Sequence, residues 1–165
     1  MAQAARGDAG AFHELVDRHA DRLFRLAVSL VGNSADAEDV LQETLIGAFR
    51  ALSGFEGRAS VKTWLTRILV NQAAHFRRRK RATGPIPETQ PATADRAAGS
   101  EAKIDVQAAI QQLSPEHRQV IVLRELEQMS YEEIATVLDL PQGTVESRLN
   151  RARTALREKL EAYLD

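Results

Sequence analysis

Eight lysine and arginine residues lie between positions 58 and 81, and this stretch contains no aspartate or glutamate. Five of them are consecutive, in the run RRRKR at 77–81. The whole chain is close to neutral, with 22 Lys and Arg against 23 Asp and Glu, so the cations form a local block. Clustered cations attract polyanions such as nucleic acids. A solvated helix end favoured by the helix dipole would explain one or two of them, but not a whole stretch without acids.

The same stretch carries side chains suited to contacting bases. On a helical wheel, Thr63, Arg67, Asn71 and Arg78 form a polar stripe, and Trp64 lies at its border with the apolar face. Opening a duplex requires cations along the backbone and polar or aromatic groups for extruded bases, which is the composition found here. Trp64 is equally well interpreted as a core residue with one edge in water, and both interpretations stay open.

A second polar and basic helix face is expected near the C-terminus, after a turn at 139–141. Serine, asparagine and arginine side chains bind base edges or phosphates in a major groove, whereas the alternative is a solvated face of an all-helical domain. The side chains that project away from the apolar stripe are Ser147, Asn150, Arg151 and Thr154, with Arg148 and Arg153 flanking them.

Other chemistry has little support in the sequence. There is no cysteine, which excludes disulfides and thiolate zinc sites, and nine scattered glycines form no phosphate-binding loop. Glu132 and Glu133 are better explained by helix capping than by acid–base catalysis. Four histidines lack metal-like spacing, namely His13, His19, His75 and His117. We therefore expect no enzyme and no metal or other cofactor.

Helical periodicity predicts three amphipathic helices that position the first basic stretch. They cover about 9–31, a segment from an N-cap at Ser34 to the break at 53–54, and a segment capped by Ser60. The inward apolar positions of the second are Ala37, Leu41, Leu45, Ala48 and Leu52. Three helices of roughly twenty residues can close a small core.

Residues 82–103 divide the chain. They hold three of the five prolines and almost no large apolar side chain, so they cannot bury enough surface to offset their chain entropy. We expect a flexible linker here, between a domain of residues 1–81 and a domain of residues 104–165.

The second domain is expected to contain a helix-turn-helix. A short helix at 106–113 precedes Ser114-Pro115, which fits an N-cap followed by Pro at the first helical position. A capping box at Ser130 starts a helix that ends at a turn over Asp139 to Pro141, before the longer basic helix. Many such turns have Gly where this chain has Asp139, but Asp tolerates the left-handed conformation. The predicted fold class is all-α, with two small helical domains joined by the linker.

Three stretches of the chain resemble a known family. ADAEDVLQETLIGAFRAL (35–52), SVKTWLTRILVNQAAHFRRRKR (60–81) and LSPEHRQVIVLRELEQMSYEEIATVLDLPQGTVESRLNRARTALRE (113–158) are similar to the extracytoplasmic-function sigma factors. These are minimal sigma-70-like subunits of bacterial RNA polymerase. Two independent signatures occur in the right order, so the resemblance is more specific than a lone helix-turn-helix.

The resemblance implies a polymerase-binding surface. Residues 35–52 correspond to the helix that docks on the clamp coiled coil of the β′ subunit, where a solvated face would be the plainer interpretation. The polar face of this helix carries Asp36, Asp39, Gln42 and Glu43. The implied partners are core RNA polymerase, through its β′ clamp and β flap, promoter DNA and an anti-sigma protein.

The resemblance also implies two DNA-binding sites. Residues 54–81 correspond to the part that recognises and melts the −10 element, with loop 53–59 holding a flipped base, and the final helices correspond to the −35 reader. The −10 residues are then Arg58, Lys62, Trp64, Arg67, Asn71, Arg77, Arg78, Arg79 and Lys80. The −35 residues are Thr144, Glu146, Ser147, Arg148, Asn150, Arg151 and Arg153.

Two positions depart from the family pattern. His75 stands where relatives often have Asp, and Glu146 stands where many have Lys or Arg. A carboxylate at position 146 repels phosphate but can accept a hydrogen bond from cytosine N4, which leaves the −35 sequence open.

These observations favour a sigma factor that binds core polymerase and directs transcription initiation. A stand-alone helix-turn-helix regulator would leave 35–52 and the linker unexplained. A basic membrane-surface protein would need aromatic and leucine anchors around 77–81, which are absent. The N-terminus has no apolar signal segment and no apolar stretch long enough to cross a bilayer, so we expect a cytoplasmic protein without membrane insertion.

Overall fold

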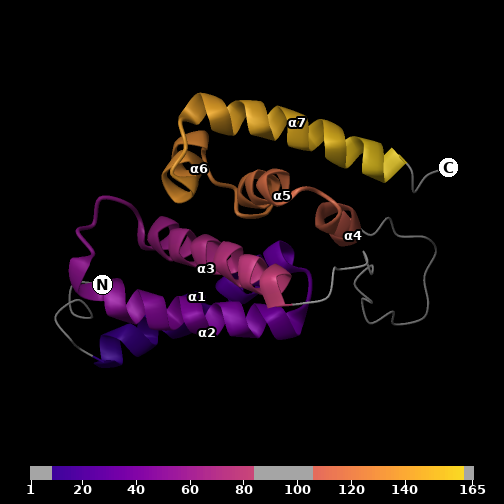
Figure 1. The fold of residues 1–165 in the computed structure, drawn as a ribbon. Coiled ribbons are helices and arrows are strands. Elements are labelled where there is room, and N and C mark those ends of the chain that lie inside the picture. Colours follow the sequence, from indigo (N-terminus) through magenta and orange to yellow (C-terminus); the bar gives the residue numbers. More distant parts are fainter. Residues whose placement is uncertain (1–8, 84–105, 162–165) are drawn as a thin grey trace.

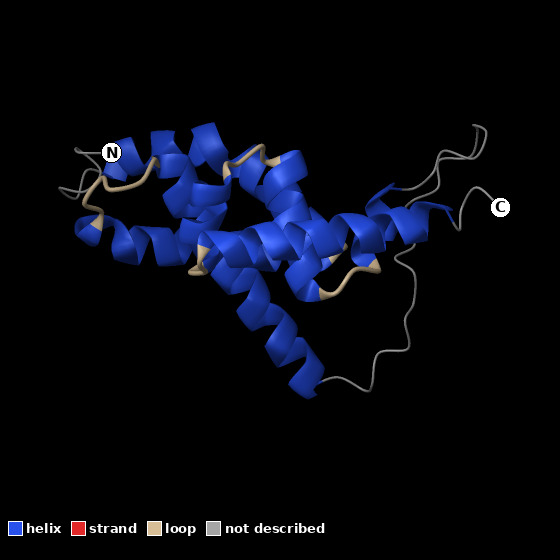
Figure 2. Ribbon diagram, turned by 90° about the horizontal axis from the view of Figure 1, so that it is seen from above, coloured by secondary structure: helices blue, strands red, loops and turns tan. Residues whose placement is uncertain are grey.

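Helices make up all of the regular secondary structure in residues 9–83 and 106–161, the part of the chain that this computed structural model describes (Figures 1 and 2). The first half contains α1 (Ala9–Val31), α2 (Ser34–Ala51), a 3-10 turn (Leu52–Gly54) and α3 (Val61–Thr83). The second half contains α4 (Val106–Gln111), α5 (Pro115–Ile121), a π-helical turn (Val122–Leu126), α6 (Tyr131–Leu138) and α7 (Gln142–Glu161). The all-α prediction is confirmed.

The predicted cap of the second helix is wrong by one residue. Asn33, not Ser34, is the N-cap of α2, because its extended backbone lets its side-chain oxygen accept from the Asp36 N–H at 2.8 Å. Asn and Ser are equally good N-caps, so the composition did not distinguish them. At the other end of this half, α3 continues to Thr83, two residues into the predicted linker. The rest of that linker lies outside the described residues.

The other local signals are confirmed. Ser60 and Ser114 accept from the backbone N–H groups of Thr63 and His117. The capping box of Ser130 and Glu133 has both reciprocal hydrogen bonds. Asp139 adopts the left-handed conformation, with φ 54°, between α6 and α7, and this completes the helix-turn-helix.

One apolar core extends through both halves of the chain. In the first half it is built from α1, α2 and α3, and in the second half from α4, α5, the π-helical turn, α6 and α7. Helix α1 packs on α4, α5 and the π-helical turn, and α3 packs on α6. In Figure 1, α4 to α6 consequently lie between the first three helices and α7. The sequence predicted two helical units but not that their faces meet.

A buried arginine joins the two halves. Arg118 is 4% exposed and its guanidinium donates only to backbone carbonyls. Helix C-termini carry partial negative charge, so these carbonyls compensate the buried cation. Burial, with Arg77 and Arg81 nearby, lowers the pKa of Arg118 to about 10, so it is charged at neutral pH. The accepting carbonyls are those of Leu30 at 3.0 Å, Ile110 at 3.1 Å, Leu113 at 3.1 Å, and Gln111.

Gly32 allows the close approach of α1 and α4. Its φ is +97°, and a Cβ built on it would lie 2.8 Å from Oε1 of Gln111, whose Nε2 donates to the Ser29 carbonyl at 2.8 Å. We expect Gly32→Ala to lower the free energy of unfolding by about 1–3 kcal/mol, because the left-handed backbone is strained for alanine and Gln111 must move. Urea denaturation measures this change. Gly143→Ala is the matched control, since nothing lies within 4 Å of its built Cβ, and equal stability of the two variants would contradict the prediction.

Candidate nucleic-acid interface

Helix α3 presents an exposed polar stripe. Its buried residues, including Leu65, Leu69 and Ala73, face the core, and this orientation leaves Arg67, Asn71 and Arg78 exposed. These three positions lie on one side of a helix, as the sequence predicted. Within residues 9–83 and 106–161, no ion pair or hydrogen bond engages their side chains, so cationic and amide groups are both open to a ligand.

Thr63, the fourth residue of the predicted stripe, is not exposed. It is 3% exposed because α6 packs over the first turn of α3. Its hydroxyl is within 2.9 Å of the Ser60 hydroxyl and 3.4 Å from Oε1 of Glu133. The helical wheel placed Thr63 correctly on the polar side of α3. Thr63 is nevertheless buried, because α6 of the second half of the chain covers that position.

Two of the predicted DNA-binding cations are bound to the protein itself. Lys62 donates to the Glu127 carbonyl at 2.7 Å. Arg77 donates to the Leu30 carbonyl at 3.3 Å, and burial is the main cause that lowers its pKa. Arg77 therefore ties α3 to the end of α1, and its removal would alter packing as well as charge.

The remaining cations of this stretch lie at the surface. Arg58 pairs with Glu56 at 2.5 Å and Lys80 with Asp36 at 2.5 Å, while Arg79 lies over the Phe76 ring, 5.7 Å from its centroid. Exposed ion pairs are weak, so such cations can exchange their partner for a phosphate. The structure thus divides the block into open, exchangeable and internally bound cations, which the sequence treated alike.

An aromatic pair borders the loop before α3. Trp64 is half-buried, and its ring meets the Phe55 ring edge to face, with centroids 5.1 Å apart and an interplanar angle of 62°. Such a pair is a packed surface with part of each ring in contact with solvent. Sequence reasoning missed Phe55, although a large aromatic residue in a short polar loop was the available signal.

The acidic face of α2 is exposed, with one exception. Asp39, Gln42 and Glu43 are open to solvent. Asp36 is not, because its carboxylate accepts from Asn33 Nδ2 at 2.9 Å and pairs with Lys80, leaving its side chain 18% exposed. The structure therefore brings three of the four predicted polymerase-binding residues together and assigns the fourth to the helix cap.

Two large apolar residues extend this acidic face. Ile46 is 38% exposed and Phe49 is 59% exposed, and both follow Asp39 and Gln42 at helical spacing. The Phe49 ring contacts that of Phe12 on α1, with centroids 5.2 Å apart. Helical periodicity alone did not single them out, although apolar residues outside the inward positions of α2 were a signal. We refer to Asp39, Gln42, Glu43, Ile46 and Phe49 as the α2 face.

Helix α7 lies on the side of the second half that faces away from α1–α3 (Figure 1). Glu146, Ser147, Asn150 and Arg151 are exposed on it, whereas Thr144 and Arg148 are half-buried. All seven predicted −35 residues therefore have at least part of their surface open. Arg153 is exposed but its guanidinium donates to the Glu125 carboxylate at 2.8 Å, which raises its pKa.

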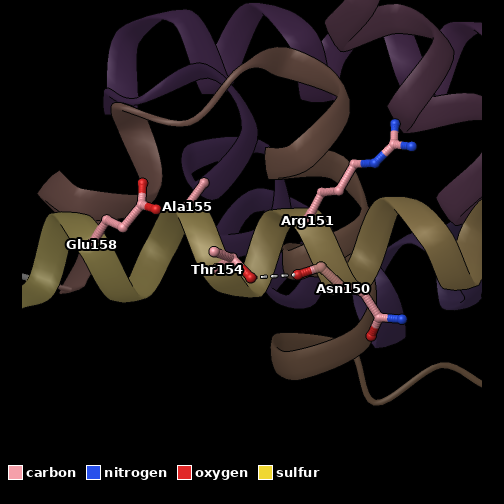
Figure 3. A pocket seen from close by; sticks show the side chains of 5 residues that line it. All are labelled: Asn150, Arg151, Thr154, Ala155 and Glu158. Atoms are coloured by element: carbon pink, nitrogen blue, oxygen red, sulfur yellow. Dashed lines mark hydrogen bonds between the residues drawn. The ribbon is translucent and has the colours of Figure 1, made fainter.

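A shallow hollow lies along the middle of α7. It is lined by Asn150, Arg151, Thr154, Ala155 and Glu158, which Figure 3 shows extending from one helix in different directions. The Thr154 hydroxyl donates to the Asn150 backbone carbonyl at 3.2 Å. A surface of this kind suits contact with a groove of a duplex rather than enclosure of a small molecule.

Within residues 9–83 and 106–161, no group of three or more His, Cys, Asp or Glu side chains is placed to hold a metal ion. No helix in the same ranges is both long and apolar enough to span a bilayer.

Comparison with known proteins identifies both halves. The sigma-70 region 2 family matches residues 15–83, and the sigma-70 region 4 family matches residues 103–156. The chain is 39% identical over 171 residues to the ECF RNA polymerase sigma factor SigE of Mycolicibacterium smegmatis, covering 96% of this chain and 66% of that protein. It is 35% identical over 175 residues to the RNA polymerase sigma-H factor of Pseudomonas aeruginosa, covering 96% and 91%. The chain belongs to the ECF sigma factors of RNA polymerase.

A solved structure is similar to this sigma factor over both regions. The sigma factor RpoE of Bartonella quintana, in complex with the anti-sigma factor NepR, has a TM-score of 0.76 and 30% identity, covering 92% of this chain and 97% of that one. Region 2 of this sigma factor thus comprises α1–α3, and region 4 comprises α4–α7. The region 2 match accounts for the half of the chain that a stand-alone helix-turn-helix regulator leaves unexplained.

Proposed function

We propose that this sigma factor binds core RNA polymerase through the α2 face, opens the −10 element with α3, and reads the −35 element with α7. The observation that carries the proposal is the presence of three exposed surfaces on three different helices, each with a chemistry suited to one of these tasks. The polymerase supplies the catalysis, so the sigma factor acts as a non-catalytic subunit. It acts in the cytoplasm.

The α2 face has the composition of a protein-binding surface. Interfaces combine a hydrophobic centre with a polar rim, and aromatic residues often contribute most of the binding energy. Phe49 and Ile46 supply the apolar centre, and Asp39 and Glu43 supply charge for a basic partner. This is the surface that we assign to the β′ clamp, while region 4 contacts the β flap.

The α3 stripe has the composition of a single-strand DNA surface. Arg67 and Arg78 hold backbone phosphates, and Asn71 between them hydrogen-bonds the edge of an unpaired base. The loop 53–59, whose Phe55 packs on Trp64 of α3, receives a base that is flipped out of the duplex. Stacking of one base on an aromatic ring contributes about 1–3 kcal/mol, which offsets the cost of unpairing.

Helix α7 reads duplex DNA in the major groove. The first turns of a recognition helix meet base edges, and here they carry Glu146, Ser147 and Asn150, with Arg151 directed to phosphate. A carboxylate at position 146 disfavours phosphate contact and favours cytosine through its N4 amino group. Two regions on one tether engage both elements together once polymerase holds them.

An anti-sigma protein is a further expected partner. RpoE of Bartonella quintana, which resembles this chain over nearly its full length, was solved in complex with such a protein. An exposed α2 face with apolar residues is a surface that a restraining partner would cover, because covering it also blocks the polymerase.

Asn71 is expected to read a base of the −10 element, and its arginine neighbours are expected to bind the backbone phosphates. Asn71→Ala should change the ranking of −10 variants, by about 1–3 kcal/mol at the affected base, with little change in salt dependence, because amide contacts read bases and not charge. The measurement is open-complex lifetime of holoenzyme on a small −10 library over a salt series. Gln72→Ala, at the next and half-buried position, is the control. An unchanged ranking with Asn71→Ala would remove this role.

A further inference from the structure

An acidic residue of region 4 is buried against region 2. The π-helical turn ends with the Glu127 N–H donating to the Val122 carbonyl at 3.1 Å, and Gln128 then adopts a left-handed conformation with φ 55°. This backbone directs Glu127 toward α1 and α3, where its side chain is only 9% exposed. Such burial of a carboxylate requires a cationic partner.

The partner is a site built by region 2 alone. Arg22 of α1 donates from Nη1 to Oε2 of Glu127 at 2.6 Å and to the Thr66 hydroxyl at 3.1 Å. Lys62 of α3 lies 3.9 Å from the same carboxylate oxygen, and its Nζ also donates to the Glu127 carbonyl. All the cations and the hydroxyl of the site thus come from region 2, while region 4 contributes the carboxylate and the backbone carbonyl of Glu127.

The carboxylate does not satisfy this site fully. Two further donors of Arg22, Nε and Nη2, are buried without a hydrogen-bond partner in the part of the chain that the structure describes. Guanidinium groups pair with phosphate through two parallel hydrogen bonds, and tetrahedral phosphate oxygens reach donors outside the plane of a carboxylate. The unused donors therefore point to a larger anion than the one now bound.

The site lies at the beginning of the proposed DNA surface. Lys62 is in the first turn of α3, one turn before Arg67, and follows the loop assigned to base flipping. The neighbouring Thr63 is covered by a second carboxylate of region 4, that of Glu133. Acidic groups of region 4 thus occupy positions where a DNA backbone entering α3 would bring phosphates.

We propose that Arg22, Lys62 and Thr66 form a phosphate site for the backbone of the melted strand, and that Glu127 fills this site when regions 2 and 4 are closed on each other. The proposal rests on the proposed role of α3 at the −10 element. Closure and strand binding at this site exclude each other, so the free sigma factor binds single strands weakly.

The first test uses the full chain and a fluorescent single-stranded oligo-dT of about 15 nucleotides, a length within the range that single-strand-binding proteins cover. Anisotropy titrations over a salt series give the affinity and its log–log salt slope. Glu127→Gln should bind about tenfold more tightly at low salt and steepen the slope by about 0.7, the value for one added phosphate contact on a single strand. Adding Arg22→Gln should return both quantities to those of the original chain. Glu132→Gln makes the same charge change on the exposed surface of α6 and should alter neither.

The second test measures closure directly. Because the chain has no cysteine, Glu38→Cys on α2 and Glu158→Cys on α7 can be labelled for energy transfer, and both positions are exposed. Glu127→Gln should populate longer distances, and oligo-dT should do the same to the chain with Glu127 intact. If Glu127→Gln lengthens the distance between the labels without steepening the salt slope, Glu127 only holds the two regions together and the proposed phosphate site is wrong. If it changes neither quantity, the whole proposal is wrong. Neither test uses polymerase, so a failure of the proposed initiation function would be seen separately, in transcription assays.

Discussion

Asp39→Lys combined with Glu43→Lys is expected to abolish assembly of this sigma factor with core RNA polymerase. Both carboxylates are exposed on the α2 face, and neither forms an ion pair within the described residues, so the fold does not depend on their charge. Placing like charges at an interface costs several kcal/mol, and two reversals together should weaken binding by roughly a thousandfold or more.

Co-purification with core polymerase measures this loss, and circular dichroism checks that the helices persist. Asp17→Lys with Asp21→Lys is the matched control, because it makes the same charge change at exposed positions of α1. If the α2 variant elutes with polymerase as the control does, the α2 face is not the docking surface.

Arg67→Ala combined with Arg78→Ala is expected to destabilise open complexes at every promoter to a similar extent. These are the two arginines of the α3 stripe without an internal partner in the described structure, and hydrogen bonds from charged groups contribute about 1.5–3 kcal/mol each. Loss of two phosphate contacts should also flatten the log–log salt slope by about 1.4 on single-stranded DNA. Arg77 is left in place because it donates to the Leu30 carbonyl within the fold.

The lifetime of competitor-resistant open complexes across a salt series measures both effects. Arg18→Ala with Arg25→Ala, exposed on α1, removes the same charge and should leave the slope unchanged. The α3 double variant could instead change the ranking of open-complex lifetimes across a −10 library, while Asn71→Ala shortens all of them equally. The roles of the arginines and the asparagine would then be reversed.

Local structure was predictable because amphipathic periodicity and capping are local signals. The extents of α1 and α2, the capping box at Ser130 and the left-handed Asp139 all depend on residues within a few positions of one another. The one wrong cap, Ser34 in place of Asn33, concerns two residue types with the same capping ability.

Contacts between the two halves were not predictable from the same signals. Arg22 and Glu127 are 105 positions apart, and neither stands out in a helical wheel. Burial of charge at Arg118 depends on carbonyls at the ends of two helices, which composition does not reveal. The sequence likewise shows how many cations lie at 58–81. It does not show which of them are open and which are bound within the protein, because that depends on the fold.

The α2 face shows how much of a binding site the resemblance to a family could predict. It directed attention to Asp39, Gln42 and Glu43, which the structure leaves exposed together. It gave no reason to separate Asp36, whose carboxylate is held by Asn33 and Lys80. The exposure of Phe49 depends on how α1 and α3 pack on α2, which neither the resemblance nor the periodicity specifies.

Run-off transcription with purified core polymerase tests the central claim most directly. With the chain present, a set of genomic fragments should yield discrete transcripts that start a fixed distance downstream of shared −10 and −35 sequences. The same reaction with core polymerase alone, or with the Asp39→Lys, Glu43→Lys variant, should yield none of them. If core polymerase gives the same transcripts with and without the chain, it does not direct initiation and the account is wrong.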